Sequence, residues 1–208
     1  MTGVLPAQAL RQLIDQGVIC ADPAITEGQI QPASLDLRLG TVAYRVRASF
    51  LAGQGRSVAE RISEFEMHRV DLTAGAVLEK GCVYLIPLME RLALPKGVTA
   101  VANAKSSTGR LDLLTRTITD GGVEFDRIAE GYHGPLYAEV CPRSFSVLAR
   151  SGQRLNQIRF RQGQAVLSDA DLAALHVQER LVDGPAVISE GLGFSVDLQP
   201  AEGDLVGY

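Results

Sequence analysis

The densest cluster of chemically useful side chains in this sequence is the run Lys105-Ser106-Ser107-Thr108-Gly109-Arg110. Two cations, three hydroxyls and a glycine within six residues suit a polyphosphate. Hydroxyl and backbone N–H groups donate to phosphate oxygens, the cations offset charge, and glycine permits close approach. The run is not a Walker A loop, because G-x-x-x-x-G-K-S/T is absent. An ordinary surface turn explains these residues equally well, so both interpretations stay open.

Glu139 is the strongest single candidate for acid–base chemistry. It lies in the alternating segment 136–140, on the side opposite Leu136, Ala138 and Val140. If both faces of the sheet are covered, burial of the carboxylate raises its affinity for a proton, which suits a general base. The alternative is a solvent-facing glutamate on a half-exposed strand.

Arg127 precedes a tight connection, residues 129–134, that leads into the Glu139 segment. Two glycines around Tyr132 are typical of such a connection. A plain turn without a functional role is the simpler interpretation of these residues.

A zinc site of the deaminase type requires H-x-E followed by P-C-x-x-C. The residues two positions after the histidines are Val70, Pro135 and Gln178, and no C-x-x-C occurs. This argues against such a site. A nucleophilic pair of Cys141 and His133 is conceivable, but nothing in the spacing supports it.

The elements that must position these residues are mainly strands. Residues 6–16 and 168–180 have helical spacing, and the polar excursion 49–67 is expected to be helical over 57–67. Period-two or apolar segments predict strands at 34–40, 41–47, 83–88, 98–102, 136–140 and 157–161. Short strands punctuated by Gly and Pro predict an all-β sandwich or barrel rather than a doubly wound α/β sheet.

Composition bounds the function without naming it. The 208 residues are 46% hydrophobic and 21% charged, which excludes wholesale disorder. A formal net charge of −4 disfavours sequence-blind DNA binding. Three sparse cysteines suggest a reducing compartment, and no signal peptide or apolar run of membrane-spanning length is visible. We therefore expect a cytoplasmic protein that binds neither nucleic acid nor membrane.

A faint internal echo relates two parts of the chain. Residues 24–28 followed by 34–37 resemble residues 187–191 followed by 195–198. Chance is one explanation. The other is that residues 186–208 begin a second copy of a domain that spans residues 1–185.

Taken together, these segments resemble the dCTP deaminase branch of the dUTPase-like superfamily. The block 31–40, containing Ser-Leu-Asp-Leu-Arg-Leu-Gly, is similar to the entry strand of the family. Residues 84–87, 94–98 and 105–111 follow in the family's order, the last being similar to "R-S-S-x-x-R-L". Residues 127–139 are similar to "R-I-D-P-G-W-x-G" with its downstream glutamate, and 152–160 are similar to "P-G-x-x-I-G-x-x-x-F".

The resemblance implies a distorted β-barrel of jelly-roll type with short flanking helices. It also implies a trimer-like homo-oligomer with active sites between neighbouring barrels. The implied reaction is hydrolytic deamination of dCTP to dUTP and ammonia, in the supply of dUTP and dTTP. No catalytic metal would take part, although Mg²⁺ would accompany the triphosphate.

The resemblance also assigns roles to individual residues. Glu139 would be the general base, Ser106 would hold the attacking water, and Arg110 would orient the carboxylate. The substrate-binding residues would be Lys105, Ser107, Arg127, Tyr132 and Gln157. Lys105 stands where the family usually has Arg, which keeps the charge but loses the planar fork.

Three departures from the family pattern bear on function. Ala129 replaces the usual Asp, which weighs against dUTP hydrolysis and leaves the sugar contact open. The stretch 115–126, which would shape the base pocket, is longer than usual, and no counterpart of the C-terminal lid follows Phe160. Two alternatives therefore stay open: a non-catalytic barrel that binds a nucleotide or supports a partner, and a bifunctional deaminase and diphosphatase.

Overall fold

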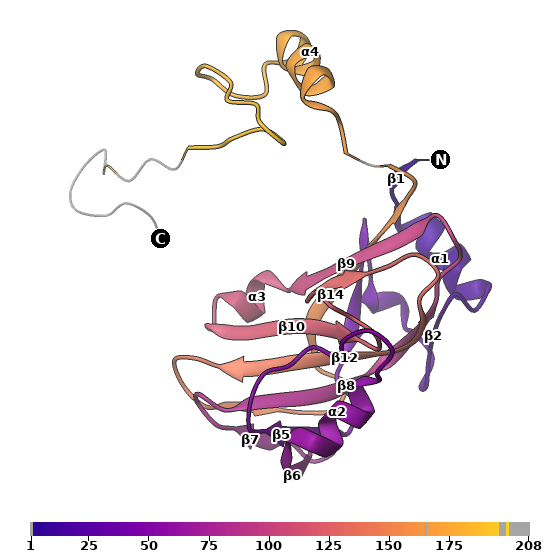
Figure 1. The fold of residues 1–208 in the computed structure, drawn as a ribbon, viewed down its shortest axis with the longest axis vertical. Coiled ribbons are helices and arrows are strands. Elements are labelled where there is room, and N and C mark those ends of the chain that lie inside the picture. The colour runs from indigo at the N-terminus through magenta and orange to yellow at the C-terminus, as the bar shows by residue number, and fades with distance from the viewer. Residues whose placement is uncertain (1, 165, 196–198, 200–208) are drawn as a thin grey trace. The chain divides into compact units, whose positions relative to one another are not determined.

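The computed structural model describes residues 2–164, 166–195 and 199 (Figure 1). The chain divides into two compact units, Met1–Gln164 and Ala165–Tyr208. The sequence-based boundary between residues 185 and 186 falls inside the second unit, and the assignment of 1–185 to one domain stays a prediction.

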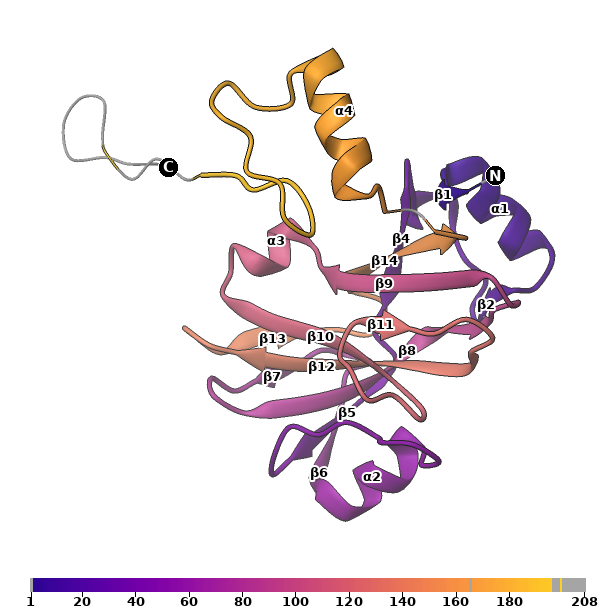
Figure 2. The same ribbon diagram turned by 45° about the horizontal axis from the view of Figure 1, so that its top comes forward.

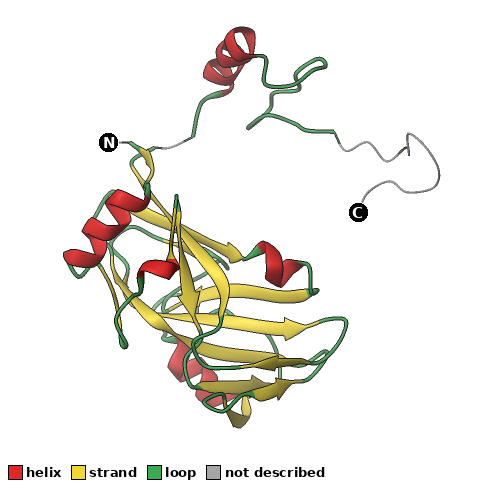
Figure 3. Cartoon of the chain, turned by 180° about the vertical axis from the view of Figure 1, so that it is seen from behind, coloured by secondary structure: helices red, strands yellow, loops and turns green. Residues whose placement is uncertain are grey.

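Two antiparallel sheets form the first unit, as Figures 1 and 3 show. One has the order β11-β9-β14-β4-β3, with β1 on β14. Its strands are β1 (Gly3–Val4), β3 (Ile30–Gln31), β4 (Ser34–Arg38), β9 (Val98–Ala104), β11 (Arg127–Ile128) and β14 (Arg154–Gln162). This confirms the expected strands at 34–40, 98–102 and 157–161.

The second sheet has the order β10-β12-β8-β5-β6, with β2 on β8. Its strands are β2 (Ile19–Ala21), β5 (Val42–Val46), β6 (Glu66–Asp71), β8 (Val83–Ala93), β10 (Leu113–Thr119) and β12 (His133–Pro142). A separate pair joins β7 (Ala76–Leu78) to β13 (Val147–Ala149). Strands dominate and helices are short, so the predicted all-β fold is confirmed.

The main core lies between the two large sheets. Leu35 and Phe160 from the first sheet belong to the same buried cluster as Ile86, Leu136 and Val140 from the second. Each such side chain contributes about 1.5–3 kcal/mol relative to its exposed state. This core holds the two sheets together and so fixes the strand that carries Glu139.

A smaller cluster covers the other face of the second sheet. It joins Leu85, Ile118 and Tyr137 of the sheet to Phe50 and Ile62 of residues 47–65, which we call the 47–65 segment. The segment contains α2 (Val58–Phe65) and lies beside β5 and β6 (Figure 2). Both faces of β12 are therefore covered.

The remaining helices follow local signals. The helix expected at 6–16 is α1 (Ala7–Asp15), and η1 (Glu27–Gln29) and α3 (Ser106–Gly109) are single turns. The helix expected at 57–67 is α2, whose first turn is capped by the Ser57 side chain accepting from Glu60 N at 3.2 Å. Such a cap contributes about 1 kcal/mol.

The second unit contains α4 (Asp169–Glu179), which confirms the helix expected at 168–180. Ser168 caps it by accepting from Asp171 N at 3.2 Å. Residues 187–191 resemble residues 24–28 in sequence, but the two segments differ in structure. A β-bridge joins Ile188 to Leu192, whereas Glu27–Gln29 form a 3-10 turn. Residues 196–198 of the echo lie outside the described residues.

Gly40 lies where the backbone following β4 approaches β8. A Cβ atom there would lie 2.6 Å from the carbonyl oxygen of Pro87, which accepts a hydrogen bond from Gly40 N at 2.8 Å. Because this neighbour is backbone, we expect Gly40→Ala to lower the free energy of unfolding by about 1–3 kcal/mol. Urea unfolding followed by circular dichroism measures the change.

The matched control for this substitution is Gly28→Ala. Apart from its neighbours in the chain, the described residues place one atom within 4 Å of the added Cβ, Nη1 of Arg154 at 3.9 Å, so the methyl group fits without backbone movement. Equal unfolding midpoints for the two variants would contradict the steric argument.

Candidate active site

Glu139 lies in the middle of β12, directly opposite Arg116 of β10 on one side and Leu85 of β8 on the other. Its side chain faces the cluster that contains Leu85, and only 1% of the residue is exposed. The half-exposed, solvent-facing alternative is therefore wrong, because the 47–65 segment covers this face of the sheet.

Arg116 holds one oxygen of this buried carboxylate. Oε1 of Glu139 accepts from Nε of Arg116 at 3.0 Å and also from Nη2. Oε2 is equally buried and has no hydrogen-bond partner within the described residues. The side chain thus carries one oxygen that Arg116 holds and one that is buried without a hydrogen-bond partner in the described residues.

Two further groups hold the Arg116 guanidinium. Nη2 donates to Oγ of Ser49 at 3.0 Å, and Cζ lies 3.7 Å from the ring centroid of Phe125. Ser49 belongs to the 47–65 segment. This segment is tied to the loop after β10 by hydrogen bonds from Gly53 N to Gly122 O and from Val58 N to Asp120 Oδ1.

Asp126 adds a second carboxyl group near Arg116 and Glu139, and unlike Glu139 it is only half-buried. Its Oδ1 accepts from Thr117 N at 2.7 Å, and its backbone has a positive φ of 63°. Burial raises the pKa of Asp126, while the Thr117 N–H and the Arg116 charge oppose the rise. The carboxyl group is therefore harder to ionise in the folded protein than in water.

Asp126→Asn tests this electrostatic cost. The raised pKa means that the folded protein binds more protons than the unfolded chain at pH values above the ordinary Asp pKa, so the residue's contribution to stability falls as pH rises. Asn keeps the acceptor for Thr117 N. We therefore expect the variant to gain stability relative to wild type, with the gain growing as pH rises above the ordinary Asp pKa.

Asp71→Asn is the control with the opposite sign. Hydrogen bonds from Thr73 lower the pKa of Asp71, so this carboxylate stabilises the fold at neutral pH and loses its effect as pH falls. Urea unfolding at several pH values measures both variants. A pH-independent difference for Asp126→Asn would show that its burial carries no such cost.

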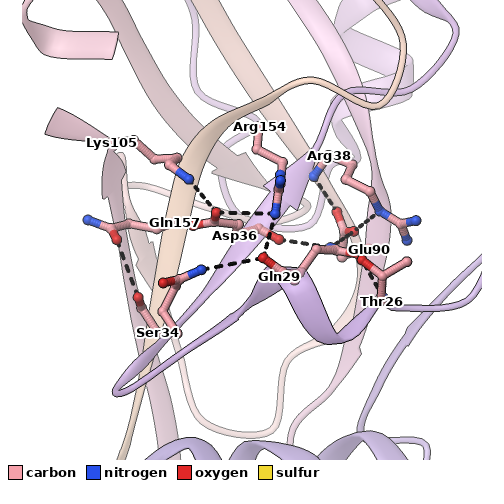
Figure 4. A network of polar contacts seen from close by, with 11 residues as sticks. Thr26, Gln29, Ser34, Asp36, Arg38, Glu90, Lys105, Arg154 and Gln157 are labelled. Carbon is pink, nitrogen blue, oxygen red and sulfur yellow. Dashed lines mark hydrogen bonds and ion pairs between the residues drawn. The ribbon is translucent and has the colours of Figure 1, made fainter. Parts of the chain in front are cut away.

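Lys105 and Gln157 lie in a different polar network, shown in Figure 4. Nζ of Lys105 pairs with Oδ2 of Asp36, which Nη1 of Arg154 also approaches at 3.7 Å. Oε1 of Gln157 accepts from Ser34 Oγ at 3.3 Å. One charge predicted to face phosphate is thus already balanced by a buried carboxylate.

This network explains why both faces of β4 are buried. All five residues Ser34–Arg38 are buried, including Asp36 and Arg38, which the period-two pattern placed on the opposite side from the leucines. Both faces are covered because Arg38 pairs with Glu90 of β8 at 2.8 Å and Asp36 with Lys105 (Figure 4).

The other residues of the 105–110 cluster form the short helix α3 and its C-cap, Arg110. Ser106, Ser107 and Arg110 are exposed, whereas Thr108 is buried and donates to Leu155 O at 3.0 Å. The start of β10 and α3 border an open groove lined by Ala104, Gly109, Asp112, Leu113, Leu114, Thr115 and Arg143. Of the 105–110 cluster, Gly109 lines this groove, while Ser106, Ser107 and Arg110 are exposed on the surface of the described unit.

Arg127 and Tyr132 flank the turn before β12. Arg127 is exposed and pairs with Glu124 at 3.1 Å. The hydroxyl of Tyr132 donates to Pro135 O at 2.5 Å and accepts from Asp120 N at 3.3 Å. Burial raises the pKa of this phenol, so it stays protonated at neutral pH.

No recorded hydrogen bond or ion pair between described residues joins Glu139 to the 105–110 cluster. Lys105 pairs with Asp36 and Gln157 with Ser34, while Glu139 pairs with Arg116, which in turn contacts Ser49 and Phe125. Sequence reasoning missed four individual site residues: Arg116, Ser49, Phe125 and Asp126. The position of Arg116 opposite Glu139 follows from strand register, which the sequence patterns did not reveal.

The structure also bears on two other kinds of site, a cysteine–histidine pair and a metal centre. His133 and Cys141 lie eight residues apart on β12, about 27 Å at the usual rise per residue, so they do not form a pair. No group of three or more His, Cys, Asp or Glu within the described residues is placed to hold a metal ion. None of the described helices is long and apolar enough to span a membrane.

Comparisons with known proteins agree with this fold. A family model described as the 2'-deoxycytidine 5'-triphosphate deaminase (DCD) N-terminal domain matches residues 1–164. The chain is 28% identical over 161 residues to "dCTP deaminase, dUMP-forming" of Coprothermobacter proteolyticus, covering 76% of this chain and 81% of that protein. It is 27% identical over 188 residues to the protein of the same name from Aquifex aeolicus, covering 86% and 98%.

Among solved structures, 2'-deoxycytidine 5'-triphosphate deaminase from Agrobacterium tumefaciens matches 86% of this chain with a TM-score of 0.81 and 53% identity. The match covers 54% of that protein, so this chain spans about half of its length. Because the family model covers most of the sequence and the fold agrees, this chain belongs to the dCTP deaminase family.

Proposed function

We propose that this chain catalyses the hydrolytic deamination of dCTP, with Glu139 as general base. One observation carries the proposal above the others. Glu139 is buried, Arg116 holds its Oε1, and its Oε2 has no partner within the described residues. A carboxylate in this state can take a proton from water without first breaking a hydrogen bond.

In the proposed reaction, the Glu139 carboxylate carries each proton that is transferred. Glu139 takes a proton from water as the resulting hydroxide attacks C4 of the cytosine ring, and it returns that proton to N3 to give a neutral tetrahedral intermediate. Glu139 then moves the proton of the new C4 hydroxyl to the amino nitrogen, the C4–N bond breaks, and ammonia and a uracil base are released. Ser106 would hold the water and Arg110 would orient the carboxylate.

Binding of the triphosphate is assigned to the exposed side chains around α3. Lys105 and Ser107 would contact phosphate oxygens, with Mg²⁺ arriving on the nucleotide. In this structure Lys105 is paired with Asp36, so part of its charge is already balanced. Arg127, Tyr132 and Gln157 would complete the pocket for the sugar and base.

The site is proposed to form between copies of the barrel. Ser106, Ser107 and Arg110 are exposed, and none of them has a recorded contact with Glu139 within the described residues. A second barrel that supplies its 105–110 cluster to Glu139 would bring the two halves together. We therefore propose a trimer-like homo-oligomer, located in the cytoplasm.

We propose dUTP as the product. At the turn where an acidic residue would position water for attack on phosphate, this chain has Ala129. The names of the relatives from Coprothermobacter proteolyticus and Aquifex aeolicus state dUMP formation, so dUMP is the alternative product.

Incubation of the purified chain with dCTP and Mg²⁺ tests the proposal. Loss of cytosine absorbance, with dUTP and ammonia in equal amounts, is the expected result. Release of pyrophosphate with dUMP would identify the bifunctional enzyme instead. Binding of dCTP without turnover would identify a non-catalytic barrel and overturn the proposal.

A further inference from the structure

We propose that Arg116 is a positioning residue that determines which oxygen of Glu139 accepts the proton. This inference rests on the proposed function, because it concerns the same carboxylate. It adds a residue to which neither the family motifs nor the comparisons give a role.

The hydrogen-bond pattern carries the inference. An arginine usually meets a carboxylate with two parallel hydrogen bonds, one to each oxygen. Here both Nε and Nη2 of Arg116 donate to Oε1 of Glu139. This leaves Oε2 buried without a partner in the described residues, an arrangement that is unfavourable in a structural ion pair. A reactive oxygen that meets water and substrate explains why this arrangement is useful.

The surroundings of Arg116 keep it in this orientation. Ser49 accepts from Nη2, and Cζ of Arg116 lies over the Phe125 ring, 3.7 Å from its centroid. The two groups come from segments far apart in the sequence, the 47–65 segment and the loop before β11. The guanidinium therefore cannot rotate to reach Oε2 without losing both contacts.

Lysine cannot reproduce this arrangement. Its ammonium group keeps the charge, but it lacks the planar fork that donates twice to one oxygen and stacks on an aromatic ring. The role of Arg116 is thus geometric as well as electrostatic, and the two parts can be separated by substitution.

The test compares Arg116→Ala, Arg116→Lys and Ser49→Ala with wild type in the dCTP deamination assay. We expect Arg116→Ala to lower kcat by about 100-fold, since a small misplacement of a catalytic group has an effect of this size. KM should change little, because Arg116 acts on Glu139 rather than on the nucleotide. Added guanidinium ion, below denaturing concentrations, should restore part of kcat, and Arg116→Lys should recover only part of the rate.

Arg69→Ala is the matched control. Arg69 also lies in the second sheet, with its Cζ 5.3 Å from the ring centroid of Tyr44 and its Nε 2.7 Å from Oε1 of Glu66. Its side chain is far more exposed than that of Arg116. The Arg69→Ala variant should have the kcat of wild type and should not respond to guanidinium.

The outcomes separate the inference from the proposed function. A wild-type chain that does not deaminate dCTP overturns both. An active wild type with an equally active Arg116→Ala variant, or a variant whose loss guanidinium does not relieve, overturns the inference alone. If Arg116→Ala does not fold, Arg116→Lys and Ser49→Ala decide, because wild-type kcat in both would exclude the positioning role.

Discussion

Replacing Glu139 with glutamine is expected to abolish deamination of dCTP, lowering kcat by about 10³-fold or more, near the upper range for loss of a general base. An amide cannot take a proton from water at neutral pH. Glutamine has nearly the same shape, and its carbonyl oxygen can still accept from Arg116, so the fold should persist. Nucleotide affinity should stay close to that of wild type.

Two measurements check this prediction. Absorbance loss gives kcat, and titration calorimetry with dCTP gives Kd. Glu66→Gln is the control, because Glu66 of β6 also pairs with an arginine of the same sheet, at 2.7 Å, but with an exposed arginine, Arg69, rather than with Arg116. A Glu139→Gln variant that keeps a tenth or more of the wild-type kcat would exclude Glu139 as the general base.

The second large effect is expected in stability. Replacing Arg38 with methionine leaves Glu90 charged and fully buried, with 0% of the residue exposed. In the native protein Glu90 accepts from Arg38 Nε, Arg38 N and Gln29 Nε2, each at 2.8 Å. Removing one partner of such a pair costs about 3–5 kcal/mol, so Arg38→Met should lower the free energy of unfolding by this amount.

A double variant distinguishes loss of charge balance from loss of packing. Because glutamine carries no charge and its carbonyl oxygen can still accept a hydrogen bond from Arg38 N or Gln29 Nε2, Arg38→Met with Glu90→Gln should recover part of the lost stability. Urea unfolding followed by circular dichroism measures all variants, and the exposed pair of Arg11 and Glu27 supplies a control whose loss leaves the midpoint unchanged. A single variant as stable as wild type would refute the prediction.

Local patterns in the sequence determined most of the secondary structure. The helix at Ala7–Asp15, the Ser57 cap of α2 and the strand that carries Glu139 all follow from spacing, capping residues and turn residues close together in the chain. The ordered motifs between residues 31 and 160 likewise identified the family that residues 1–164 match. These signals are readable because each depends on neighbours within a few positions.

The tertiary structure alone decided the surroundings of Glu139. Its burial depends on the 47–65 segment covering β12, and its pairing with Arg116 depends on register between strands 23 residues apart. In the same way, Asp36 and Lys105 are joined across 69 residues. Alternation along one strand shows which side chains share a face, but only the pairing of distant segments determines what covers that face and which charges meet there.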